Sequence, residues 1–290
     1  MNEVLILEIK AQLYDNLEKN GIVILPPMDV NDSINLLKST GLAATVTMLD
    51  PWYNRGTGGV RDDYIDFILN ILNNVKDITT HLYLWGFPEI VAQFVDKIPA
   101  PLAFSTWLTW YYKNNPSVIR GWRSSQQTCL HLSTPSGKLY PEKFFNDTQR
   151  ERYQDKKMRF IPGPPSVIEE SLLVGFIGKK EQTAHPAQKH FKVYGKILKM
   201  TTKRGELTFD PMCGSGTTGE VCQALGMKAI LSDMSEEYTQ ICEKRLGLKR
   251  LDCPALRQLI PTSPITPLPT VQIVIPKQNA DDVIQMQLNW

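Results

Sequence analysis

The 290-residue sequence predicts a doubly wound α/β fold built on a mostly parallel sheet. Along residues 1–111, apolar β-branched runs alternate with segments of helical period, and residues 205–246 repeat that order. Residues 112–175, in contrast, are basic and aromatic and show no sustained period. We therefore divide the chain into residues 1–111, a basic insertion at 112–175, residues 176–250 and a proline-rich tail at 251–290.

The first of these regions is predicted to alternate helices and strands. We expect helices over 5–19, over 34–42 with Asp32-Ser33 as the cap, over 62–75 and over 87–98. Strands are expected over 21–27, 44–49, 81–86 and 103–112.

The third region is predicted to contain a helix over 184–200 followed by a βαβα unit. Its strands are expected over 205–210 and 228–233, and its helices over 217–226 and 235–246. The proline-rich tail is expected to lie on the surface or to be partly disordered.

Composition excludes several classes of protein. A hydrophobic content of 42% with 21% charged residues excludes general disorder, and no apolar run approaches the roughly 20 residues that cross a bilayer. The N-terminus lacks the basic region of a secretory signal, so we expect a cytoplasmic protein without membrane contact. The five cysteines and four histidines have no metal-ligand spacing, so no metal site is expected.

The charge is unevenly distributed along the chain. Residues 111–160 contain ten Lys or Arg and four Asp or Glu, although the whole chain has a net charge of only +2. Such asymmetry favours a polyanionic partner that meets this region.

A glycine-rich turn follows the strand predicted to end at Asp210. Glycines let the backbone approach a ligand, and the next helix offers free N–H donors at its start. Asp233 ends the following strand, where an acid can accept hydrogen bonds from the ribose hydroxyls of an adenosyl group. Asp210 itself is suited to hold a ligand ammonium or a water. The turn has no P-loop lysine, which argues against ATP or GTP hydrolysis, whereas Gly214 to Gly219 could mimic a dinucleotide fingerprint.

A second motif, Asp50-Pro51-Trp52-Tyr53, lies where another predicted strand meets a loop. If the strands of Asp50 and Asp210 are neighbours, both acids face one crevice. A carboxylate and a carbonyl can accept hydrogen bonds from an exocyclic amine, and an aromatic ring can stack on a base. The alternative is a plain type I turn with two core aromatics.

Together these segments resemble the β-group of S-adenosylmethionine-dependent DNA amino-methyltransferases, in which the catalytic motif precedes the cofactor motif. Residues 50–53 resemble D-P-P-Y, with Trp52 in place of the second proline, and residues 185–189 resemble H-P-x-Q-K. Residues 210–218 resemble D-P-F-x-G-S-G-T-T, and residues 232–238 resemble the acidic ribose motif. Asp32-Ser33 resembles the family's Gly-Asp, with Asn31 in place of glycine.

The resemblance implies a Rossmann-like methyltransferase fold, S-adenosylmethionine as cofactor and a base flipped out of double-stranded DNA as target. Asp50 and the Pro51 carbonyl would hold the target amine and Tyr53 would stack on the base, so Asp50, Pro51, Trp52 and Tyr53 form the predicted catalytic set. The implied cofactor-binding set is Asp32, His185, Lys189, Asp210, Pro211, Cys213, Gly214, Ser215, Gly216, Thr217, Thr218 and Asp233.

The basic insertion is the predicted target-recognition region, where phosphate contacts would offset the cost of base flipping. The predicted DNA-binding residues are Arg55, Arg61, Lys113, Arg120, Arg123, Lys156, Lys157 and Arg159. By family usage, Asp at the first catalytic position favours N6 of adenine. The alternatives are N4 of cytosine, an RNA or protein methyltransferase, and a catalytically inactive DNA-binding relative. A restriction endonuclease partner, and a monomer or homodimer, both fit the sequence.

Overall fold

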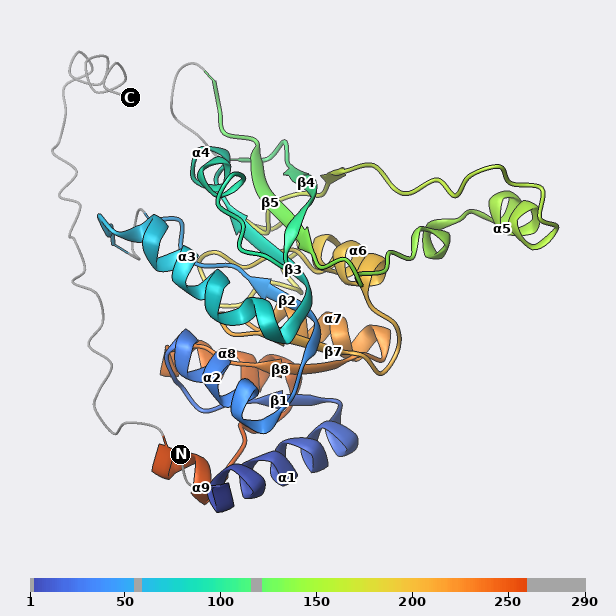
Figure 1. Ribbon diagram of the computed structural model, residues 1–290. Coiled ribbons are helices and arrows are strands. Elements are labelled where there is room, and N and C mark those ends of the chain that lie inside the picture. Colours follow the sequence, from blue (N-terminus) through green and yellow to red (C-terminus); the bar gives the residue numbers. More distant parts are fainter. Residues whose placement is uncertain (1–2, 55–58, 116–121, 260–290) are drawn as a thin grey trace, which may run out of the picture.

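The computed structural model describes residues 3–54, 59–115 and 122–259 (Figure 1). Its eight-stranded sheet has the order β1-β8-β7-β2-β3-β5-β4-β6. Every described strand except β5 runs in one direction, because β5 alone pairs antiparallel with both of its neighbours. The predicted doubly wound, mostly parallel α/β fold is confirmed.

The N-terminal elements follow the predicted order. They are α1 (Glu3–Asn20), β1 (Ile22–Ile24), α2 (Val30–Thr40), β2 (Ala44–Leu49), α3 (Tyr64–Val75), the 3₁₀ turn η2 (Lys76–Ile78), β3 (Thr79–Gly86) and β4 (Ala103–Tyr111). Two expectations about helices were wrong here. Asp29, not Asp32, caps α2, because its side chain accepts from the Asn31 N–H at 2.8 Å. The helix expected over 87–98 is limited to α4 (Pro88–Val91) and the 3₁₀ turn η3 (Ala92–Phe94).

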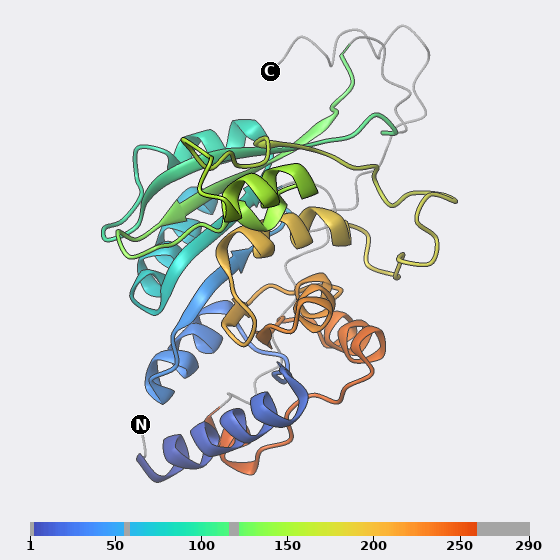
Figure 2. The same cartoon turned by 90° about the vertical axis from the view of Figure 1, so that its right-hand side faces the viewer.

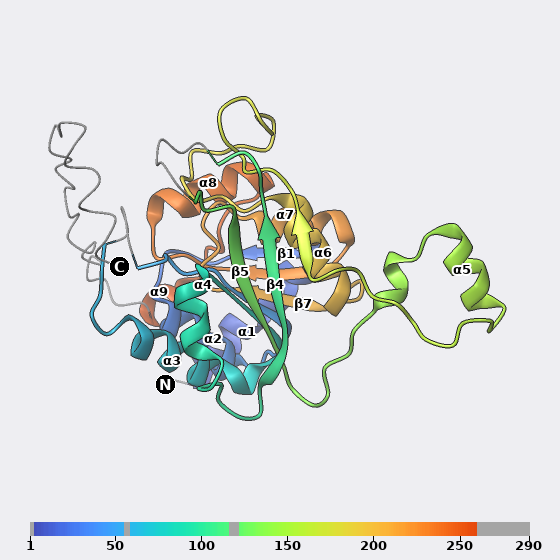
Figure 3. The ribbon, with the colours of Figure 1, turned by 90° about the horizontal axis from the view of Figure 1, so that it is seen from above.

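Residues 112–175 contain regular structure that their sequence conceals. Strand β5 (Gln126–Ser133) lies between β3 and β4, and β6 (Val167–Glu169) pairs with β4. Between them an arm carrying the 3₁₀ turn η4 (Pro141–Phe144) and α5 (Asp147–Gln154) projects from the body (Figure 3). The strand escapes prediction because two of its buried positions, Thr128 and His131, are polar.

The C-terminal elements are α6 (Phe191–Thr201), β7 (Leu207–Asp210), α7 (Thr217–Leu225), β8 (Lys228–Leu231), α8 (Glu236–Leu246) and α9 (Pro254–Leu259). Helix α6 begins later than expected because the His190 side chain caps it. Helix α9 lies within the predicted tail, and Figures 1 and 2 show it beside α1, where Ala255 and Leu256 join the core. Residues 260–290, the rest of that tail, lie outside the described residues.

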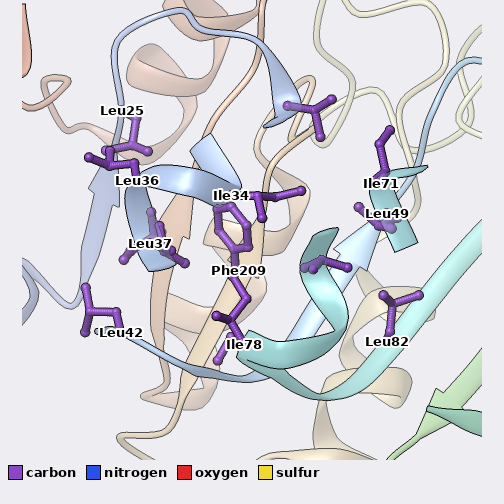
Figure 4. Packing of buried hydrophobic residues seen from close by; sticks show 14 of the residues in the cluster. Leu25, Ile34, Leu36, Leu37, Leu42, Leu49, Ile71, Ile78, Leu82 and Phe209 are labelled. Atoms are coloured by element: carbon purple, nitrogen blue, oxygen red, sulfur yellow. The ribbon is translucent and has the colours of Figure 1, made fainter. Parts of the chain in front are cut away.

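The two faces of the sheet bury separate cores. Helices α1 to α4 and α9 cover one face, and α6 to α8 cover the other. Successive strand residues alternate between them: Leu82 and Leu84 face the first core, and Tyr83 and Trp85 the second. In the first core, Phe209 packs among residues that include Ile34, Leu37 and Ile78 (Figure 4).

The strand order places the candidate motifs together. Strands β2 and β7 are direct neighbours, with Thr47 opposite Phe209, and β8 lies on the other side of β7. Parallel strands have their carboxyl ends at the same edge, where an α/β sheet binds ligands. Asp50, Asp210 and Asp233 therefore share one edge, and the condition for Asp50 and Asp210 to face one crevice, that their strands are neighbours, is met.

Candidate functional site

The turn after β7 adopts a conformation that requires glycine at two positions. Gly214 and Gly216 have φ angles of +49° and +77°. A Cβ atom on Gly214 would lie 2.9 Å from Nε2 of His185, and one on Gly216 would lie 2.6 Å from Sγ of Cys242. Because Gly216 directly precedes α7, the turn presents backbone to a ligand at the start of that helix.

Two side chains from α8 and the end of β8 hold this turn in place. Arg245 donates to the Thr217 hydroxyl at 2.8 Å and the Ser215 hydroxyl at 3.0 Å, and its remaining N–H groups bind Glu220. Asp233 accepts from the Gly214 N–H at 2.9 Å. Arg245 was not among the predicted cofactor-binding residues; its signal in the sequence is the Glu-Lys-Arg-Leu run that ends α8.

Asp210 is a buried acid at the tip of β7. Its carboxylate accepts from the Thr218 hydroxyl and, at 3.2 Å, from the Met212 N–H. Burial raises the pKa of Asp210 to about 7, so the carboxyl is poised between its neutral and ionised forms near neutral pH. Burial also raises the pKa of Asp233, although backbone N–H groups oppose that rise.

His185 is a neutral side chain beside the turn. Its Nδ1 accepts from the Ala187 N–H at 3.2 Å, and burial lowers its pKa to about 4. Its ring contacts Tyr238 edge-on, with ring centroids 4.3 Å apart. An uncharged imidazole therefore forms one wall of the turn.

The remaining members of the predicted cofactor set are dispersed. Pro211 and Cys213 are buried, and the Cys213 N–H donates to the Ser232 carbonyl at 2.9 Å. Asp32 lies exposed in the first turn of α2, two positions after the start of that helix. The Thr217 hydroxyl binds the Lys189 carbonyl at 3.2 Å, so it links the turn to the segment before α6.

Asp50 is the most heavily bonded acid of the site. The Lys189 ammonium lies 2.7 Å from Oδ1 and 2.6 Å from Oδ2. The Tyr53 hydroxyl is 3.1 Å from Oδ1, and the Tyr194 hydroxyl is 3.3 Å from Oδ2. Lys189 thus contacts the predicted catalytic acid, whereas its predicted place was beside the cofactor. Tyr194 was missed; it follows Lys189 by five residues, at a buried position of α6.

Trp52 points away from this acid and into the first core. Its ring packs against Tyr64 and Phe67 of α3, with centroid separations of 5.3 Å and 5.7 Å. Its indole N–H donates to the Gly59 carbonyl at 3.2 Å, and the Tyr64 hydroxyl donates to the Trp52 carbonyl at 2.6 Å. The ring that replaces proline therefore anchors the turn to the first core.

The predicted DNA-binding residues fall into separate groups. Arg61 donates two hydrogen bonds to the Asp63 carboxylate, at 2.7 and 2.8 Å, and Lys113 forms an ion pair with Glu169 at 2.6 Å. Arg123 is exposed beside the fully exposed Trp122, near the end of β4. The other described members, Lys156, Lys157 and Arg159, lie on the projecting arm (Figure 3). Arg55 and Arg120 lie outside the described residues.

Neither a membrane helix nor a metal cluster is found in the parts of the chain that the structure describes. None of those helices is long and apolar enough to cross a bilayer. No group of three or more His, Cys, Asp or Glu side chains there is arranged to hold a metal ion.

Comparison with known proteins identifies the family. The profile of the N6/N4 methyltransferase family, described as DNA methylase, matches residues 8–244. The chain belongs to this family. The predicted resemblance to DNA amino-methyltransferases is thereby confirmed.

Among curated relatives, the type II methyltransferase M.HpaI of Haemophilus parainfluenzae is 29% identical over 213 residues, which cover 68% of this chain and 66% of the relative. The type II methyltransferase M2.LlaDCHI of Lactococcus lactis subsp. cremoris is 44% identical over 81 residues, which cover 27% of this chain and 30% of the relative. The chain thus spans less than two thirds of the length of these relatives.

Solved structures share the fold at low sequence identity. A complex of M1.HpyAVI with SAM superposes with a TM-score of 0.60 at 21% identity and covers 78% of this chain and 100% of its own. The cytosine-N4-specific PvuII DNA methyltransferase has a TM-score of 0.57 at 16% identity, with coverages of 82% and 92%. The predicted methyltransferase-type architecture is therefore confirmed as a fold.

Proposed function

We propose that the chain transfers a methyl group from S-adenosylmethionine to the exocyclic amine of a base flipped out of double-stranded DNA. Membership of the DNA methylase family supports this proposal. The observation that carries it is the meeting of Asp50 and Asp210 at one edge of the sheet, beside a turn that admits no side chain at Gly214 or Gly216.

The residues around the turn fit S-adenosylmethionine. The turn presents its backbone at the start of α7, and Asp233 keeps acceptor capacity for ribose hydroxyls. Asp210 would favour a ligand ammonium in its ionised form, and the neutral His185 adds no charge that would repel it. When bound, the cofactor supplies an electrophilic methyl group on a sulfonium.

The Asp50 turn would prepare the target nitrogen. The Asp50 carboxylate and the Pro51 carbonyl accept hydrogen bonds from the amine, which draws its lone pair out of conjugation with the base. Tyr53 stacks on the flipped base, and flipping itself costs a few kcal/mol. Much of the acceleration would come from proximity between the nitrogen and the methyl donor.

We propose N6 of adenine as the target, because the catalytic motif begins with Asp. The same arrangement serves N4 of cytosine, since both amines sit beside a ring nitrogen acceptor. We therefore retain this second candidate, which is the specificity named for the structural neighbour PvuII DNA methyltransferase.

Residues 112–175 would supply target recognition, with the projecting arm as one contact surface. A restriction endonuclease partner, a monomeric or homodimeric state and a cytoplasmic location remain predictions from the sequence.

Asp50→Ala tests the proposed function. We expect the wild-type chain to form N6-methyladenine in methylation-free genomic DNA, as measured by mass spectrometry of the nucleosides. We expect Asp50→Ala to reduce methylation by at least about 1,000-fold while it binds S-adenosylmethionine normally. Because the substitution leaves the Lys189 ammonium buried, Asp50→Ala with Lys189→Met serves as the control for folding.

The possible outcomes separate the alternatives. N4-methylcytosine would keep the mechanism and change the base. Cofactor binding by the wild-type chain without any methylated base would favour an inactive relative or another substrate. Near-normal turnover by Asp50→Ala would contradict the catalytic assignment.

A further inference from the structure

Three donor groups surround the Asp50 carboxylate. A carboxylate offers about four lone-pair positions. Lys189 takes one on each oxygen, at 2.7 and 2.6 Å, Tyr53 takes a second on Oδ1 at 3.1 Å, and Tyr194 takes a second on Oδ2 at 3.3 Å. An amine that is to bind Asp50 must therefore displace one of these three donors.

Lys189 and Tyr194 are poorly placed to leave. The Lys189 side chain is only 4% exposed, so separation from Asp50 would leave a buried ammonium without its counter-charge. Tyr194 is buried in α6 and stacks on Trp85, with ring centroids 5.8 Å apart. Both residues hold the carboxylate in position.

Tyr53 already has a second acceptor. Its hydroxyl lies 3.0 Å from Oε1 of Gln127 on β5, as close as it lies to Asp50. A hydroxyl has one proton and so donates to one acceptor at a time. Rotation of the hydroxyl about the Tyr53 C–O bond is enough to redirect its hydrogen bond from Asp50 to Gln127. The Tyr53 ring does not need to move.

We propose that the Tyr53 hydroxyl occupies one acceptor position of Asp50 in the free protein and donates to Gln127 instead when the target amine arrives. Gln127 is then a positioning residue for methyl transfer, acting through Tyr53. The inference rests on the proposed function in one respect, namely that the incoming donor is the amine of a base. It assigns a role to β5, the strand that departs from the parallel order of the sheet.

A double-mutant cycle with Tyr53→Phe and Gln127→Leu tests this exchange. We expect Gln127→Leu alone to lower kcat/KM for DNA methylation about tenfold, because the displaced hydroxyl is left without an acceptor. In the Tyr53→Phe background, which has no hydroxyl to accommodate, Gln127→Leu should lower kcat/KM by less than about twofold. Equal losses in both backgrounds would overturn the proposal.

Gln126→Leu is the matched control. Gln126 precedes Gln127 on β5 and is exposed, and successive strand side chains point to opposite faces. The control should therefore leave kcat/KM within about twofold of wild type. A loss comparable to that of Gln127→Leu would indicate a general effect on β5 and would count against the proposal.

A second cycle does not depend on turnover. Tyr53→Phe and Asp50→Ala, measured by thermal unfolding without DNA, should change Tm non-additively because the two side chains share a hydrogen bond in the free protein. Additive changes would overturn the exchange even if the chain methylated no DNA. Absence of methylation by the wild-type chain would count against the proposed function alone.

Discussion

Asp50 and Asp210 are two acids at one sheet edge whose surroundings differ in charge. Asp50 is compensated by the Lys189 ammonium and two tyrosine hydroxyls. The described donors to Asp210 are the uncharged Thr218 hydroxyl and Met212 N–H, which do not offset burial, and its pKa rises to about 7. The two residues therefore suit different tasks. Asp50 is suited to accept hydrogen bonds, and Asp210 is an acid that becomes fully ionised beside a cationic ligand.

The raised pKa of Asp210 predicts a pH dependence of stability. Between the ordinary pKa of 3.8 and about 7, the folded chain keeps a proton that the unfolded chain releases, so this group's contribution is present at low pH and is lost as pH rises. We expect Asp210→Asn to have a higher Tm than wild type at pH 8, and the difference in Tm to be smaller at pH 5. Exposed Asp96 provides the control, and Asp96→Asn should change Tm little at either pH.

Ionisation of Asp210 should also change the affinity for the cofactor. We expect the affinity of wild type for S-adenosylmethionine to rise between pH 6 and 8 as Asp210 ionises, and that of Asp210→Asn to stay nearly constant. A parallel rise in both proteins, measured by calorimetry, would show that another group holds the ammonium.

At the scale of elements, the glycine-rich turn depends on helices that contribute nothing to its sequence motif. Helix α8 supplies both Arg245, which ties down Ser215 and Thr217, and Cys242, which fills the space beside Gly216. Strand β5 likewise brings Gln127 to Tyr53 from a part of the chain 74 residues away. The motif is thus held in shape by neighbours that its own residues do not specify.

Gly216→Ala and Gly205→Ala separate steric overlap from backbone strain. Both glycines have positive φ, +77° and +80°, but a Cβ on Gly205 meets nothing within 4 Å, whereas one on Gly216 meets Cys242 at 2.6 Å. We expect Gly205→Ala to cost about 1 kcal/mol of unfolding free energy and Gly216→Ala about 3 kcal/mol. Only Gly216→Ala should also weaken binding of S-adenosylmethionine.

Urea denaturation measures the change in unfolding free energy, and equilibrium binding measures the change in affinity for S-adenosylmethionine. Cys242→Ala should recover part of the stability lost in Gly216→Ala, because the next atom lies 3.4 Å from the added Cβ. Equal losses of unfolding free energy in the two variants would show that backbone strain alone, without steric overlap, explains why position 216 requires glycine.

At the scale of the whole molecule, the proposed site at the sheet edge and the cationic residues of the arm occupy separate regions. The sheet gathers the acids at the carboxyl ends of β2, β7 and β8. The arm between β5 and β6, which contains Lys156, Lys157 and Arg159, projects from the body (Figure 1). A long duplex can contact both regions at once, so the arm would add affinity without touching the target base.

Lys156 and Lys157 on the arm test this separation. We expect replacement of both by Gln to weaken DNA binding and to reduce the slope of log affinity against log salt by up to about 1.8, or about 0.9 for each lost phosphate contact. Binding of S-adenosylmethionine should not change. The matched control replaces Lys10 and Lys19 of α1, which lies at the far end of the molecule from the arm in Figure 1. An equal change in slope for both pairs would contradict a specific role for the arm.

Residue patterns alone predicted the fold class and the order of the motifs, and they predicted that Asp50 and Asp210 would face one crevice if their strands were neighbours. Those predictions rest on local periodicity and on the rule that parallel strands end at one edge. The adjacency of β2 and β7, and the side chains that complete the site, became evident only in the folded chain. Lys189 contacts Asp50 across 139 residues, and Tyr194 and Gln127 reach the same turn from α6 and β5. Strand order and helix packing create these contacts, and neither leaves a periodic signal in the residues that make them.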